Sequence, residues 1–79
     1  MVALSPQQSQ RLVVCINNEG YEASLERRKL YSLVPDLDAK RHKLVRVVDE
    51  SGEDYLYPES YFLPVALPPA TRQAVLAAA

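Results

Sequence analysis

Along most of the chain, short segments rich in apolar residues are separated by turn-forming residues. In several of these segments apolar and polar positions alternate. The run Arg11 to Ile16 is rich in β-branched residues and stops at the turn formers Asn17 to Gly20, which predicts a first strand. Leu30 to Val34 predicts a second strand, ended by Pro35, because proline has no amide to donate to a ladder.

The connections on either side of the second strand carry many charges. Residues 17–29 are interpreted as a long loop with irregular strand pairing, because Tyr21, Ala23 and Leu25 alternate with polar positions. A helix over residues 24–30 stays as the alternative, since Leu, Glu, Arg and Lys are good helix formers. Residues 36–42 form a charged connection with room for one turn of helix.

A tight hairpin is predicted in the second half of the chain. Lys43 to Val48 and Asp54 to Tyr57 are its strands, and Asp49 to Gly52 is its turn. Pro58 to Tyr61 then leaves room for one turn of 3₁₀ helix, and Phe62 to Leu67 predicts a last short strand.

The two ends of the chain differ from this strand pattern. Residues 1–10 are polar and predict a flexible N-terminal arm. Residues 68–79 open with two prolines and are rich in alanine, which predicts a C-terminal helix of about ten residues. Val75, Leu76 and Ala79 form its apolar stripe, which needs a surface to pack against because so short a helix is marginal alone in water.

These elements predict an all-β fold. Five short strands over residues 11–67 suit a small, partly open barrel, which buries alternate residues and leaves few free edges. The residues expected to point inward are Val13, Cys15, Leu25, Tyr31, Leu33, Val45, Val47, Tyr57, Phe62 and Val65.

The order of elements resembles the SH3-like barrel over roughly residues 11–67. The resemblance rests on the long loop Asn17 to Lys29 after the first strand, and on Pro58-Glu59-Ser60-Tyr61-Phe62 before the last strand. The stretch Leu44 to Val65 is also similar to small uncharacterised bacterial proteins of this fold, which implies a fold and no mechanism. Peptide-binding members carry a groove tryptophan, whereas this chain has none and has His42 and Lys43 at the corresponding positions. Of the other groove positions, Tyr61 is present, and Tyr21 lies in the corresponding loop.

Composition narrows the class of protein. The 79 residues, 48% apolar and 24% charged, suit one small globular domain. Cys15 is the only cysteine and His42 the only histidine, so neither a disulfide nor a zinc site with Cys/His ligands is expected. A single thiol and the absence of a long apolar run lead us to expect a soluble cytoplasmic protein with no membrane span and no cofactor.

The net charge of −1 hides a strong asymmetry. Residues 27–46 hold seven Lys/Arg against two Asp, whereas residues 47–71 hold five acids and no base. Because the second and third strands are expected to be neighbours, their flanking cations are predicted to form one basic patch that attracts phosphate or an acidic protein. Its members are Arg27, Arg28, Lys29, Lys40, Arg41 and Lys43. Neutralisation by the acidic hairpin is the alternative interpretation.

No catalytic constellation can be assembled from these residues. Cys15 lies in an apolar strand, where burial raises a thiol pKa, and His42 lies between basic residues, so we expect no enzyme. The acidic hairpin turn, residues 49–54, lacks the spacing of a calcium loop and is interpreted as a solvated tip.

Two functional hypotheses remain. The first is a non-enzymatic protein-interaction module that binds a partner protein, or a second copy, through tyrosines or the C-terminal helix. Its candidate residues are Tyr21, Tyr55, Tyr61, Val75 and Leu76. The second is weak nucleic-acid or ribosome association through the basic patch, which must weaken steeply with salt.

Overall fold

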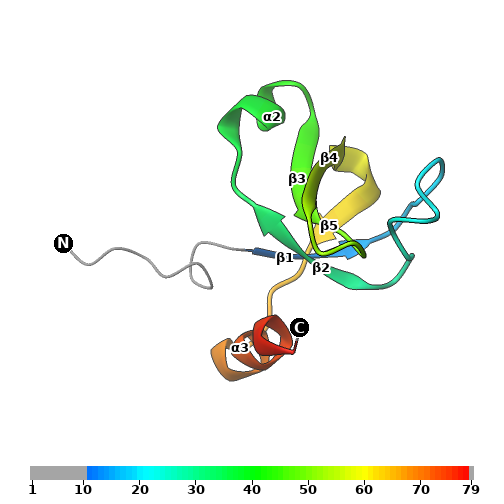
Figure 1. The fold of residues 1–79 in the computed structure, drawn as a ribbon. Coiled ribbons are helices and arrows are strands. Elements are labelled where there is room, and N and C mark those ends of the chain that lie inside the picture. The colour runs from blue at the N-terminus through cyan, green and yellow to red at the C-terminus, as the bar shows by residue number, and fades with distance from the viewer. Residues whose placement is uncertain (1–10, 79) are drawn as a thin grey trace.

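A five-stranded antiparallel sheet forms the body of the protein in a computed structural model that describes residues 11–78 (Figure 1). Its order is β4-β3-β2-β1-β5. The strands are β1 (Arg11–Cys15), β2 (Leu30–Val34), β3 (Leu44–Val48), β4 (Asp54–Pro58) and β5 (Phe62–Pro64). The arm predicted for residues 1–10 lies outside the described residues.

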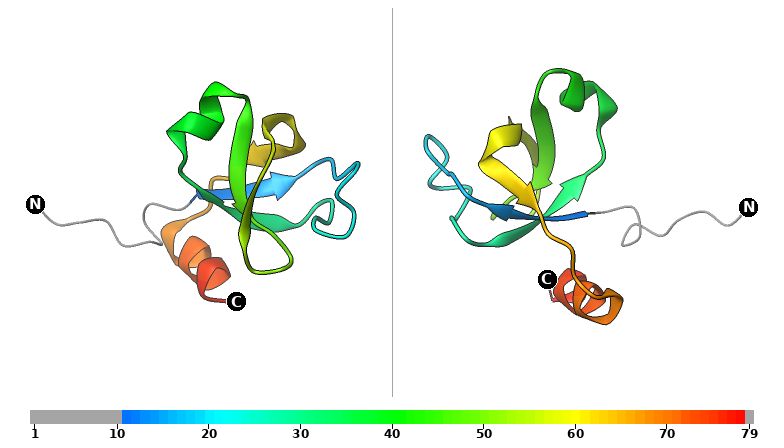
Figure 2. Two further views of the ribbon diagram at one scale, coloured as in Figure 1. Left: turned by 45° about the horizontal axis from the view of Figure 1, so that its top comes forward. Right: turned by 180° about the vertical axis from the view of Figure 1, so that it is seen from behind.

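The prediction of a mainly β fold with a short C-terminal helix is confirmed, but the sheet is not closed. β4 and β5 are its two edges, with no pairing between them among the described residues. The sheet bends so that β3 and β4 stand over β1 and β2 (Figures 1 and 2). This curvature gives the sheet a concave inner face, and the core lies on that face.

The core consists of the inward-facing residues of all five strands and one residue of the loop between β1 and β2. The alternation that the sequence predicts is confirmed for seven residues that form one buried cluster: Val13, Cys15, Leu25, Tyr31, Val47, Tyr57 and Phe62. Leu33 and Val45 pack against this cluster and are only partly buried, and Val65 is half-buried.

Residues 11–78 also contain three short helical segments. α2 (Leu37–Arg41) begins after Asp36, whose side chain accepts a hydrogen bond from the Ala39 amide and so caps the helix. η1 (Glu59–Tyr61) is the predicted 3₁₀ turn before β5. α3 (Pro69–Ala77) lies on the outer side of β1 and β2, opposite the core (Figure 2). Leu12 is not among the residues expected to point inward, yet it is only 4% exposed. It lies on that outer side of β1, because it alternates with the inward-facing Val13.

Element boundaries differ slightly from the sequence pattern. β1 ends at Cys15, one residue before Ile16. Lys43 lies outside β3, because its φ of 58° is incompatible with an extended strand. β5 is three residues long instead of six, and the Val65 amide just after it still donates to the Leu12 carbonyl of β1 at 3.0 Å.

Candidate functional site

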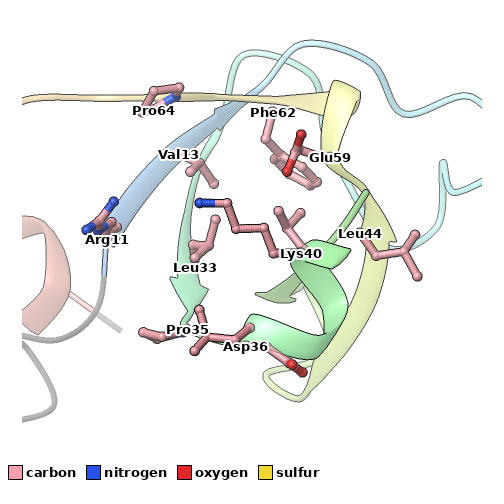
Figure 3. A pocket seen from close by; sticks show the side chains of 12 residues that line it. Arg11, Val13, Leu33, Pro35, Asp36, Lys40, Leu44, Glu59, Phe62 and Pro64 are labelled. Carbon is pink, nitrogen blue, oxygen red and sulfur yellow. The ribbon is translucent and has the colours of Figure 1, made fainter. Parts of the chain in front are cut away.

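An apolar pocket of about 390 Å³ opens at one end of the concave face (Figure 3). Pockets that bind small ligands or single side chains in proteins start at about this size. Its apolar walls come from β1, the end of β2, the start of β3 and β5. They are formed chiefly by Val13, Leu33, Pro35, Val45, Phe62 and Pro64.

The pocket is open because α2 covers it incompletely. Ala39 is the only residue of α2 that is buried, and alanine has too little volume to fill the space. Leu37 lines the pocket yet is 78% exposed. A leucine so exposed beside an apolar hollow leaves apolar surface in water that a partner is able to cover.

Four charged residues line the pocket: Arg11, Asp36, Lys40 and Glu59. Asp36 has partners of its own, because Arg46 Nε lies 3.0 Å from its carboxylate and the Ala39 amide donates to it. The hydrogen bond from the Ala39 amide, and after it the hydrogen bond from the Arg46 guanidinium, lower the pKa of Asp36. Among residues 11–78 the structure gives no ion pair to the other three.

The other end of the concave face is filled. Leu25, from the loop between β1 and β2, is fully buried in the core cluster. The Asn18 side chain donates a hydrogen bond to the Leu25 carbonyl at 3.0 Å, and the Glu50 amide donates to the Ser24 carbonyl at 3.1 Å. These bonds hold the loop against the hairpin. A second hollow of about 900 Å³ lies beside this loop, but its lining is largely polar and charged and includes Asn18, Glu22, Glu26, Arg27 and Arg28.

A buried carboxylate also stabilises this filled end. Asp49 is 7% exposed and accepts hydrogen bonds from the Tyr57 hydroxyl and from the Ser51 hydroxyl and amide. Burial alone raises the pKa of Asp49, but the bonds from Ser51 and Tyr57 outweigh it, so the pKa is lowered. Burial, together with Asp49, raises the pKa of Tyr57 to about 12.

Glu50 forms a second, more exposed link at the same end. It accepts a hydrogen bond from the Tyr31 hydroxyl, and Lys29 Nζ lies 2.6 Å from its carboxylate. The bond from Lys29 and then that from Tyr31 lower the pKa of Glu50. The acidic turn therefore ties the hairpin to β2 and its preceding loop, instead of being only a solvated tip.

The predicted tyrosine site is only partly assembled. Tyr21 makes edge contacts with Tyr57 and Tyr61, with ring centroids 5.0 and 6.0 Å apart, and Tyr61 donates a hydrogen bond to the Glu19 carbonyl. Tyr55 is not part of these ring contacts, because it is 49% exposed at the sheet edge and bonds to Glu53. The Tyr55 side chain therefore does not share the burial of Tyr57, although the two residues lie on the same face of β4.

The structure divides the six predicted patch cations between the two ends of β2. Residues 27–29 precede Leu30, whereas residues 40–43 follow Val34 through α2. β2 and β3 are neighbours, as expected, but they are antiparallel, and a five-residue strand spans roughly 16 Å. Lys29 is also paired with Glu50, and the structure does not bring the six cations together at one end of β2.

The apolar stripe of α3 and the Cys15 thiol are partly and fully buried, respectively. Val75 and Leu76 are half-buried on α3, while Ala79 lies beyond the described residues. Cys15 is fully buried, and burial raises the pKa of its thiol.

The described residues contain no group of three or more His, Cys, Asp or Glu able to hold a metal ion. None of the helices in residues 11–78 is long and apolar enough to cross a membrane.

Sequence reasoning missed the pocket as a site. It named Lys40 only as a surface cation, and it gave no role to Arg11, Leu37 or Glu59. The one signal in the sequence was Leu37, an isolated apolar residue between Asp36 and Asp38. An apolar residue in a charged connection is either buried or left exposed for a partner to cover. Comparison of the chain with protein-family models, curated proteins and solved structures gave no match.

Proposed function

We propose that the protein is a non-enzymatic protein-interaction module of a bacterial cytoplasm, which holds an apolar side chain of a partner protein in the open pocket. The observation that carries this proposal is the uncovered apolar hollow with Leu37, 78% exposed, beside it. Burying a leucine-sized side chain contributes about 1.5–3 kcal/mol, which is enough to anchor a short peptide segment when flanking contacts add to it.

The same proposal treats the open sheet as an SH3-like barrel. The strand order, the long loop after β1 and the 3₁₀ turn between β4 and β5 support this assignment. Small β folds of this kind present ligand surfaces between loops, and the fold alone does not determine the ligand. The pocket, rather than the fold, is therefore the basis of the functional proposal.

The nucleic-acid alternative has weaker support. Phosphate binding by surface cations needs several of them on one face, whereas residues 27–29 and 40–43 flank opposite ends of β2. Self-association through α3 is also less well supported, because Val75 and Leu76 are already half-buried within this chain.

Selection from a displayed library of random peptides tests the proposed function. Peptides selected on the full chain should lose roughly tenfold in affinity for Leu37→Ser, since a leucine contact is removed. The matched control is Leu63→Ser, which changes a leucine that is 51% exposed on β5 and does not line the pocket. Equal binding to both variants, or no selectable peptide at all, would contradict the proposal.

A further inference from the structure

The charges at the mouth of the pocket do not cancel. Asp36 is compensated by Arg46, which leaves Arg11 and Lys40 against the single carboxylate of Glu59. Arg41 and Lys43 lie beside Lys40 on α2 and just after it, and the structure gives neither an ion pair among residues 11–78. This end of the protein thus presents an apolar hollow with an excess of positive charge at its edge.

Lys40 is placed so that it reaches a ligand in the hollow. Its side chain extends from α2 across the pocket toward Val13 and Leu33, and the ammonium group lies at the end of that reach (Figure 3). The carboxylate of Asp36 points away from it (Figure 3), and Arg46 Nε lies 3.0 Å from that carboxylate. A charge beside an apolar wall is screened less than one in open water, so an anion next to the anchor gains more from it.

We infer that the partner of this pocket is an acidic peptide segment with one apolar anchor residue, whose flanking carboxylates contact Lys40 and Arg11. The inference rests on the proposed function and specifies its ligand. The apolar hollow favours a protein segment over a nucleic acid, because it suits an aliphatic or aromatic side chain, and the excess of cations at its edge favours flanking carboxylates.

Three synthetic peptide pools test this inference on the full chain. The first has a central leucine or phenylalanine with two acidic residues on each side. The second replaces the acids by their amides, and the third replaces the apolar residue by serine. We expect the acidic pool with its apolar anchor to bind tightest, and to bind roughly tenfold more weakly to Lys40→Met, in line with loss of one charge-assisted contact.

Two further variants distinguish a direct contact of Lys40 with the peptide from a general electrostatic attraction. Lys40→Arg keeps the charge and should retain most of the affinity, whereas Arg27→Met removes an exposed cation at the other end of β2 and should leave it unchanged. Binding to the acidic pool should fall as salt rises, and binding to the amide pool should not.

The other outcomes are distinguishable. Equal affinity for the acidic and amide pools, both lost in Leu37→Ser, would overturn the inferred ligand and leave the proposed function intact. Failure of all three pools would remove the support for both. Displacement of the acidic pool by a twelve-nucleotide single-stranded DNA at 150 mM salt would overturn the inference in favour of nucleic-acid binding.

Discussion

The two ends of the concave face differ in how completely side chains fill them. At one end Leu25 is fully buried, and its loop is held to the hairpin by hydrogen bonds. At the other end α2 contributes only Ala39 to the interior, and Leu37 stays 78% exposed beside a hollow of about 390 Å³. We therefore expect the filled end to contribute most to stability, and we propose that the open end binds the partner.

The largest effect is expected from truncation at the filled end. Leu25→Ala removes a fully buried side chain and leaves a cavity, so the free energy of unfolding should fall by about 2–5 kcal/mol. Urea denaturation followed by far-UV circular dichroism measures this, since the chain has no tryptophan to report by fluorescence. A loss below about 0.5 kcal/mol would mean that the filled end is not the stabilising one.

Loss of the buried carboxylate should have a smaller effect. Asp49→Ala leaves the Tyr57 hydroxyl without its acceptor, and the free energy of unfolding should fall by about 1–3 kcal/mol. Glu53→Ala is the matched control, because it removes an exposed carboxylate that accepts a hydrogen bond from the exposed Tyr55 hydroxyl. Equal urea midpoints for these two variants would contradict the role given to Asp49.

The same groups predict how stability depends on pH. The folded pKa values of Asp49 and Glu50 are lowered, so their contribution is complete above the unfolded values of roughly 4 and is lost as pH falls below them. The folded pKa of Tyr57 is raised to about 12, so its contribution to the free energy of unfolding is present below roughly pH 10 and is lost as pH rises toward 12.

Urea midpoints measured from pH 3 to pH 11 test this dependence. We expect a plateau between about pH 5 and 9, with a decline on either side, and a shallower acid decline in Asp49→Ala. Identical acid declines in that variant and in the unchanged chain would show that Asp49 does not carry the acid sensitivity.

The smallest effect on stability is expected at the open end. Leu37→Ser changes a residue that is 78% exposed, so the free energy of unfolding should shift by no more than about 0.5 kcal/mol. The same variant should lose peptide affinity, and this separation of stability from binding sharpens the contrast between the two ends. A large loss of stability in Leu37→Ser would contradict it.

The sequence pattern predicted the filled end better than the open end. Alternation placed Val47 and Tyr57 inward, and the turn formers located the hairpin, because local propensity and burial agree there. The pocket depends instead on how far α2 stands from the sheet, which no local pattern encodes. The division of the cations between the ends of β2 follows likewise from the antiparallel register of β2 and β3.

The most direct test of peptide binding at the open end is amide chemical-shift mapping with the ¹⁵N-labelled full chain. On titration with the acidic, apolar-anchored peptide pool, we expect the shifts to gather at Val13, Leu33, Leu37 and Val45, with the amides of the loop from Asn18 to Leu25 unchanged. Shifts confined to Tyr21 and its loop, or spread over the outer face around Leu63, would contradict it.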